Sequence, residues 1–351
     1  MWTLYVLWVA LLCWGGLKFF WWWQFGVQLT ESPGTETVWE GFYPELYRSG
    51  AMKAELAPDA GHYSVLLLGA SVLEQTAPRL EQELRRELGD RLRFYNLARA
   101  AHTSRDSFLK YSHLENRHFD LAIFYHAIND SRMNRCPDDA FREDYTHVSF
   151  YRAFQSRLAA GRLRLTDFVR NDLAEAKPSA SNDQLSKLYS ARIKTAGAFR
   201  HNLEPIVQAT EDRHCPIVLM TFAYHIPPNY TDAAFRARRL DYGRSVSACE
   251  ISLWGTPPGV KAAIDAHNQV IREVASRHKN VIFVDQKATM PTDGRHFIDP
   301  CHLTDQGIGL FVRHVMEALR AKGELRLAKG EKRQADGPEA ADGRARREPN
   351  P

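Results

Sequence analysis

The feature that most limits how this chain can fold is a repeated alternation of short apolar runs and helical patterns. The apolar runs that predict buried strands are 63–68, 92–97, 120–126, 216–222 and 281–285, and helical spacing marks 79–88, 104–117, 193–210, 260–277 and 303–319. Continuous apolar strands separated by amphipathic helices are typical of parallel sheets that helices cover on both faces. The sequence therefore predicts an α/β three-layer sandwich with a central, mostly parallel five-stranded sheet, in which ligands gather beyond the carboxyl ends of the strands.

Two segments interrupt this alternation, at 131–190 and 227–258. Both are longer than ordinary connections of about 4–6 residues. Because each follows a strand end, each either overhangs the predicted site as a lid or decorates the periphery of the domain. We expect one domain over 61–322 and a linker over 28–60 before it. We expect a disordered tail over 328–351, because its small, charged and polar residues include no large apolar side chain to bury.

Residues 1–27 predict an N-terminal membrane anchor. No charged side chain occurs from Met1 to Leu17, and Lys18 is followed by the aromatic run 19–23. About 20 apolar residues span a bilayer, and tryptophan favours its interface. A cleaved signal peptide and a buried globular helix are the alternatives, but the run lacks a preceding basic segment and a following A-x-A site. We expect an uncleaved transmembrane helix, whose orientation the few flanking basic residues leave open.

Composition excludes several other classes of protein. The chain has 351 residues, of which 44% are hydrophobic and 25% charged, as in ordinary globular proteins. The formal charge of +4 does not indicate a nucleic-acid partner. No C-x-x-C or H-E-x-x-H pattern occurs, so no metal is expected. Five cysteines are too few for a disulfide scaffold; Cys136–Cys301 and Cys215–Cys249 are hypothetical pairs in an exported domain, with the connectivity left open.

The residues that follow the predicted strands carry groups for nucleophilic catalysis. Ser71 follows the first strand, Asn129 follows the third, and His302 stands at the start of the last helix with Asp299 three residues before it. A carboxylate that binds one ring nitrogen of histidine leaves the other nitrogen as a base, and an asparagine amide can bind an oxyanion. Each residue alone is also explained as a turn or a helix cap, so their order after successive strands carries the interpretation.

In this order the residues resemble the SGNH (GDSL-like) hydrolase superfamily. The matching stretches are Gly69-Ala70-Ser71, Asn96 to Ser104, Ala127 to Asp130, and Asp299 to His302 with Leu303-Thr304 and Gly307. The resemblance covers about Ser64 to Leu319 and implies the flavodoxin-like SGNH hydrolase fold. It also implies a nucleophile at Ser71, a base at His302 oriented by Asp299, and no metal or organic cofactor. The implied oxyanion donors are the N–H groups of Ser71 and Ala101 and the amide of Asn129.

Two alanines depart from the family pattern. Ala101 and Ala127 stand where family members have glycine; alanine keeps the backbone N–H but adds a methyl group. Four further residues, His102, Arg105, His126 and Arg132, lie close to the second and third motifs. Each is either a residue that binds substrate or an ordinary hydrogen-bonded or ion-paired group, and the arginines would suit an anionic substrate.

The function that we expect from these features is that of a membrane-anchored serine esterase with its catalytic domain outside the cytoplasm. Its substrate would be an ester, such as an O-acetyl group, on an envelope carbohydrate or lipid. One alternative is an O-acyltransferase of envelope polysaccharide that uses the same residues. The other, motivated by Ala101 and Ala127, is a catalytically inactive binding or assembly protein that keeps the fold.

Overall fold

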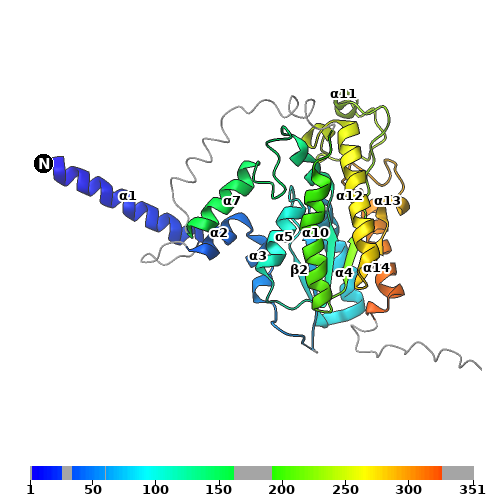
Figure 1. Ribbon diagram of the computed structural model, residues 1–351, viewed down its shortest axis with the longest axis horizontal. Helices are drawn as coiled ribbons and strands as arrows, with labels where there is room; N and C mark the ends of the chain where they lie inside the picture. Colours follow the sequence, from blue (N-terminus) through cyan, green and yellow to red (C-terminus); the bar gives the residue numbers. More distant parts are fainter. Residues whose placement is uncertain (1, 26–33, 60, 162–191, 326–351) are drawn as a thin grey trace, which may run out of the picture.

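The centre of the molecule is a five-stranded parallel sheet with strand order β2-β1-β3-β4-β5. The computed structural model describes residues 2–25, 34–59, 61–161 and 192–325 (Figure 1). The strands are β1 (Tyr63–Gly69), β2 (Leu92–Asn96), β3 (Leu121–Tyr125), β4 (Ile217–Met220) and β5 (Val281–Val284). The five predicted strands are confirmed apart from their ends. The chain leaves β1 to form β2 on one side and β3 on the other, so β1 lies at the topological switch point where such sheets bind ligands.

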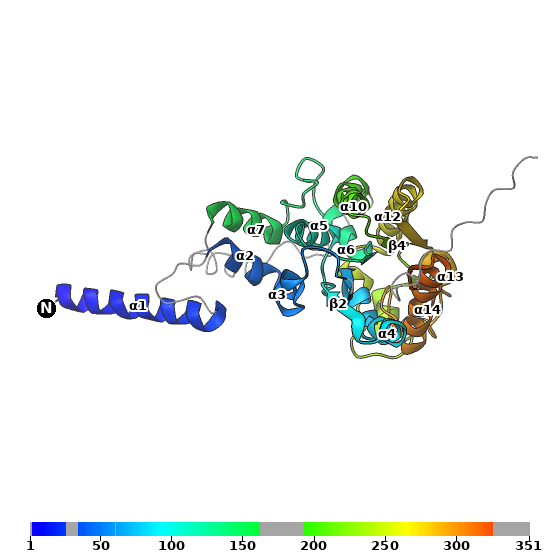
Figure 2. The ribbon, with the colours of Figure 1, turned by 90° about the horizontal axis from the view of Figure 1, so that it is seen from below.

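Helices cover both faces of this sheet, which confirms the three-layer sandwich. Helices α4 (Ser71–Leu88) and α14 (Asp305–Ala321) lie on one face, and α5 (Ser104–His113), α10 (Thr195–Asp212) and α12 (Pro257–Arg277) lie mainly on the other (Figure 2). Side chains alternate along each strand. Leu67 and Ile123 therefore pack in the cluster with α4 and α14, while Leu66 and Phe124 pack in the cluster with α5 and α10. Each layer thus has its own apolar core.

Helix α4 begins earlier than the sequence predicted. The expected start at residue 79 placed Pro78 just outside the helix, whereas α4 begins at Ser71 and contains Pro78. Proline removes one backbone hydrogen bond from a helix interior. Here Val72, Leu73 and Leu80 are buried against the sheet, and this packing outweighs the lost bond. The consequence is that Ser71 occupies the first turn of a long helix.

The prediction of a linker at 28–60 is wrong for its described part. Residues of this segment form α2 (Thr35–Phe42), α3 (Glu45–Arg48) and a 3-10 turn, η1 (Ala51–Lys53). Val38, Tyr43 and Leu46 have no exposed surface and belong to the same apolar cluster as Leu66. Gly41, Pro44 and Gly50 interrupt the segment, so no single helical period was long enough to predict these elements.

The two long insertions add short elements at the carboxyl edge of the sheet. The first contains η3 (Arg132–Asn134) and α7 (Ser149–Ala160), after α6 (Ile128–Ser131); residues 162–191 lie outside the described part. The second contains α11 (Asp232–Arg236) and η4 (Ile251–Leu253). Two further short elements, η2 (Gly89–Arg91) and α13 (Gln286–Thr289), flank β2 and β5. Both insertions contribute residues to the surroundings of Ser71, as shown below.

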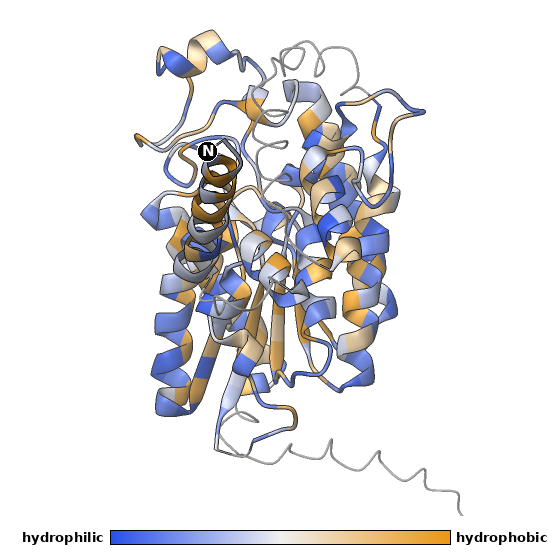
Figure 3. Ribbon diagram, turned by 90° about the vertical axis from the view of Figure 1, so that its left-hand side faces the viewer, coloured by the Kyte–Doolittle hydropathy of each residue, from blue (hydrophilic) through white to orange (hydrophobic). Residues whose placement is uncertain are grey.

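The N-terminal helix α1 (Trp2–Phe25) projects from the body of the domain (Figure 1). Its stretch Trp2–Phe20 has a mean hydropathy of 1.6 and is not buried, and among the described helices it is the one long and apolar enough to cross a membrane. Its apolar colouring in Figure 3 contrasts with the polar outer faces of the domain helices. A signal sequence has the same properties. The predicted tail at 328–351 lies outside the described residues.

Candidate active site

Ser71 is held at the turn where β1 ends and α4 begins. Its backbone N–H lies in the first turn of α4, where the helix itself provides no acceptor. The positive end of the helix dipole favours negative charge at this position. The side chain of Ser71 points to His302, with 2.8 Å between Oγ and Nε2. A hydroxyl oxygen and a backbone donor are therefore presented together at the switch point of the sheet.

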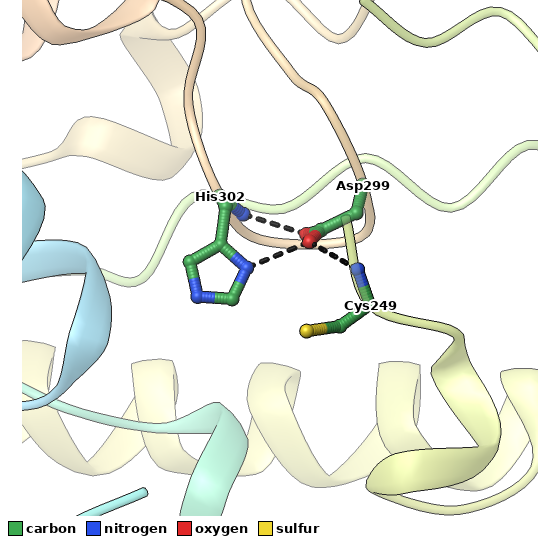
Figure 4. A group of neighbouring side chains, drawn as sticks. All are labelled: Cys249, Asp299 and His302. Carbon is green, nitrogen blue, oxygen red and sulfur yellow. Dashed lines mark hydrogen bonds and ion pairs between the residues drawn. The ribbon is translucent and has the colours of Figure 1, made fainter. Parts of the chain in front are cut away.

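His302 is oriented by Asp299. The Nδ1 atom of His302 lies 2.7 Å from Oδ2 of Asp299 (Figure 4). Oδ1 of Asp299 accepts the backbone N–H groups of Cys301 and His302, each at 2.8 Å, and Oδ2 also accepts that of Cys249 at 2.8 Å. An ionised carboxylate can accept hydrogen bonds but cannot donate them. Nδ1 therefore carries the proton, and Nε2 accepts the hydrogen bond from Ser71. The arrangement fixes the tautomer that a general base requires.

Asp299 is fully buried yet stays ionised. Burial alone would raise the pKa of its carboxyl group, but the hydrogen bonds from the His302 ring and from the backbone outweigh burial and lower the pKa. The negative charge is therefore available to stabilise a protonated imidazole on His302.

The segment around His302 is fixed by a glycine and a helix cap. Phe297 and Leu303 pair across a β-bridge, which brings Asp299 and His302 together at its tip. Thr304 caps α14 by accepting the N–H of Gly307 at 3.1 Å. A Cβ atom at Gly307 would overlap the carbonyl oxygen of His296, so only glycine allows this close approach. This contact explains why the pattern after His302 requires a glycine at position 307.

The three expected oxyanion donors lie around the same edge of the sheet. Within the described residues, the backbone N–H groups of Ser71 and Ala101 have no protein acceptor. Asn129 donates from Nδ2 to the carbonyl oxygen of His102 at 2.8 Å, and its Oδ1 accepts the indole N–H of Trp254 at 2.8 Å. An amide nitrogen has two hydrogens, so Asn129 keeps one donor for a ligand.

Of the four residues with a weaker expectation, the structure places two beside a cavity. His102 and Arg132 line a cavity of about 690 Å³ next to Ala101. His126 and Arg105 are not among the residues that line this cavity. His126 is fully buried and bound to Ser107 at 2.7 Å, and the Arg105 guanidinium lies over the ring of Phe108. Nearness to a motif in sequence does not tell whether a side chain points toward the cavity or into the packed layers.

Two residues near the site were not among those predicted from the sequence. Trp254, from the second insertion, holds the amide of Asn129 and lies with its ring centroid 6.3 Å from that of His302. Gln75, one turn after Ser71 on α4, donates to the carbonyl oxygen of Leu303 at 2.8 Å and accepts its N–H at 3.0 Å. A spacing of four residues from Ser71 was a usable signal for Gln75. No sequence signal indicated Trp254.

One cluster has the spacing of metal ligands. Ligand atoms of Cys249, Asp299 and His302 all lie within 4.8 Å of one another (Figure 4). The hydrogen bonds described above already account for the grouping of these residues. All five cysteines have free thiols, so the hypothetical Cys136–Cys301 and Cys215–Cys249 bridges are absent from the structure.

Comparison with solved structures returns GDSL-like lipases and acylhydrolases. A GDSL-like lipase from Bacteroides thetaiotaomicron is 13% identical, with 80% of this chain and 98% of that chain covered and a TM-score of 0.47. An acetylxylan esterase from Geobacillus stearothermophilus is 13% identical (73% and 94% covered, TM-score 0.43), and a lipase/acylhydrolase from Enterococcus faecalis is 15% identical (74% and 96% covered, TM-score 0.40). No protein-family model and no curated protein matches the chain. These similarities concern the fold, and the residues of the site carry the chemical inference.

Proposed function

We propose that this chain is a serine esterase in which Ser71, His302 and Asp299 act as nucleophile, general base and orienting carboxylate. The observation that carries this proposal is one unbroken chain of hydrogen bonds. Ser71 Oγ lies 2.8 Å from His302 Nε2, and His302 Nδ1 lies 2.7 Å from Asp299 Oδ2. Nucleophile, base and orienting group within hydrogen-bond reach are the signature of an activated serine.

The proposed reaction transfers the acyl group first to the serine and then to water. Ser71 Oγ attacks the ester carbonyl carbon while His302 Nε2 takes the hydroxyl proton. The carbonyl oxygen becomes an oxyanion that the N–H groups of Ser71 and Ala101 and the free amide hydrogen of Asn129 bind; one such donor contributes about 2.7–4 kcal/mol to lowering the barrier. His302 gives its proton to the leaving alcohol, and water then repeats the sequence at the acyl-serine. The chemistry needs no metal or organic cofactor.

A labelling experiment tests the nucleophile. Wild-type protein should react with a fluorophosphonate probe and hydrolyse 4-nitrophenyl acetate. Ser71→Ala should abolish labelling, and both Ser71→Ala and His302→Ala should lower kcat by at least about a thousandfold. Ser112→Ala, which changes an exposed serine on α5, is the matched control and should behave as wild type. Equal labelling of wild type and Ser71→Ala would contradict the assignment.

The proposed location is the outer side of a membrane, with α1 as an uncleaved anchor. The proposed substrate is an ester, such as an O-acetyl group, on an envelope carbohydrate or lipid. The apolar and unburied stretch Trp2–Phe20 supports the anchor. Protein that stays in the membrane pellet after a carbonate wash, with an intact mass that includes α1, is the expected result. A soluble mature protein that has lost α1 would contradict it.

The same residues would also serve an acyltransferase, which differs only in the acceptor that attacks the acyl-serine. Acetate release from an acetylated donor, measured with and without an added sugar acceptor, separates the two reactions. Esterase activity predicts equal acetate release in both. Acetylated acceptor formed at the expense of acetate would favour transfer instead.

A further inference from the structure

The cavity next to the oxyanion loop has two arginines in its wall. Arg132 and Arg135 both line the cavity of about 690 Å³, together with Ala100, Ala101 and His102 from the loop after β2. Pockets of about 300–1,000 Å³ hold small ligands or one part of a larger ligand. The cavity therefore adjoins the position where the ester carbonyl would be bound.

Neither arginine is neutralised by an ion pair. Arg132 donates to the backbone carbonyl oxygens of Ala101 at 2.5 Å and Asn129 at 3.3 Å, and Arg135 donates to that of Ser252 at 2.8 Å. The buried Nε of Arg135 has no hydrogen-bond partner. Among the described residues, no carboxylate lies within ion-pair distance of either guanidinium. Two cations that face a cavity with donors to spare are the arrangement that binds an anion.

The charged side chains that line the cavity are Arg132, Arg135 and Asp106, which together leave one positive charge. Hydrogen bonds from Tyr43, Tyr151 and the backbone of Thr103 hold the Asp106 carboxylate in place but do not remove its charge. His102 adds no charge at neutral pH, because burial lowers its pKa to about 4. Burial and the nearby charge of Arg132 lower the pKa of Arg135 to about 10, so this guanidinium group stays protonated at neutral pH. The repulsion between the two arginines is relieved when an anion binds.

We propose that this cavity binds an anionic group of the substrate, so that the preferred ester is carried by an acidic sugar unit. Phe150 and Tyr151 add aromatic surface to the same wall, against which the apolar face of a sugar ring can pack. The inference rests on the proposed esterase function and adds the substrate class. Arg132 has a second role, since its bond to Ala101 also positions the oxyanion loop. Arg135 does not touch that loop, so it is the residue to test.

The test compares two esters that differ in one charged group. O-acetylated glucuronic acid and O-acetylated glucose differ only in a carboxylate in place of a hydroxymethyl group, and acetate release gives kcat/KM for each. Wild type should prefer the acidic ester. Arg135→Gln should lower this preference at least about tenfold, and Arg135→Lys should restore part of it, because a charged hydrogen bond is lost in the first variant only. Arg152→Gln, which removes an exposed arginine from α7, is the matched control and should keep the preference.

A binding measurement separates this inference from the proposed activity. Calorimetry on the full chain carrying Ser71→Ala, with glucuronate and glucose as probes, should detect glucuronate binding that Arg135→Gln weakens at least about tenfold. Arginine-dependent glucuronate binding without any ester hydrolysis would support the anion site and contradict the esterase. Hydrolysis with equal preference for both esters, in wild type and Arg135→Gln, would overturn the anion site and leave the esterase standing. Preference for the neutral ester would overturn it as well.

Discussion

At the scale of single residues, Ala101 has the most unusual backbone in the candidate site. Its φ angle of 67° lies in the left-handed region that favours glycine. The bond from Arg132 to its carbonyl oxygen holds this conformation. The conformation directs the N–H of Ala101 away from protein acceptors, which is what an oxyanion donor needs. Alanine thus adopts a conformation that glycine adopts more readily, at a cost of about 1–2 kcal/mol in backbone strain.

Replacing Ala101 with glycine should stabilise the protein. Ala101→Gly removes the strain but adds freedom to the unfolded chain, so we expect the free energy of unfolding to rise by up to about 1 kcal/mol. Urea unfolding measures the change. The neighbouring exposed Ala100, which does not have a positive φ, provides the control; Ala100→Gly should lower stability by about 0.4–1 kcal/mol. Loss of stability in Ala101→Gly would contradict the strain argument.

At the scale of elements, Gln75 joins the two segments that carry Ser71 and His302. Its side chain forms two hydrogen bonds with the backbone of Leu303, so α4 is fixed to the segment that leads into α14. This contact supports a role for Gln75 in positioning the two segments rather than in the reaction itself. A shift of about 1 Å between the proposed nucleophile and the proposed base is enough to lower the rate about a hundredfold.

Substitution of Gln75 should therefore lower kcat more than it raises KM. We expect Gln75→Leu to lower kcat about tenfold or more, and Gln75→Glu to have a smaller effect because it still accepts the N–H of Leu303. Hydrolysis of 4-nitrophenyl acetate gives both constants. Gln82→Leu makes the same change at an exposed position of α4 and should leave them unchanged. A rise in KM alone would assign Gln75 to substrate binding instead.

The elements also show what the sequence could and could not predict. The fully buried strands β1, β3 and β4 are continuous apolar runs, and β2 and β5 are short runs rich in apolar residues, so all five were predictable. The short helices α2 and α3 were not predictable, because glycines and a proline interrupt the local pattern. The order of the strands was not predictable either, because it depends on pairing between distant segments. The motif order predicted Ser71, Asp299 and His302 as neighbours. Contacts such as that between Trp254 and Asn129 join residues 125 positions apart, and no local pattern reports them.

At the scale of the whole molecule, buried histidines tie stability to pH. Burial lowers the pKa of His102 to about 4, that of His267 to about 3, and that of His126 well below its usual value. His267 accepts from Thr195 and donates to the carbonyl oxygen of Ala127, which suits the neutral ring. Below pH ~6.5 the unfolded chain binds protons that the folded chain does not, so acidification favours unfolding.

Acidification from about pH 6.5 to about pH 4 should therefore lower the free energy of unfolding. Asp130 acts in the opposite direction, because burial raises its pKa to about 6 and the folded state takes up this proton first, but three histidines outweigh one carboxyl. Each histidine contributes up to about 1.4 kcal/mol per pH unit. Urea unfolding across this range should show a shallower pH slope for His267→Asn than for wild type. His201→Asn, at an exposed position, should keep the wild-type slope. Stability that rises on acidification would contradict the prediction.

The short distance in sequence between α1 and α2 limits where this domain can work. Thr35 lies ten residues after Phe25, and ten residues bridge at most about 36 Å even when fully extended. Since α2 is packed into the domain core, this reach also limits the distance between the domain and the bilayer when α1 is embedded in it. With α1 as the proposed anchor, the candidate site reaches only a thin layer above the lipid surface, and the proposed ester substrate would have to lie within that layer.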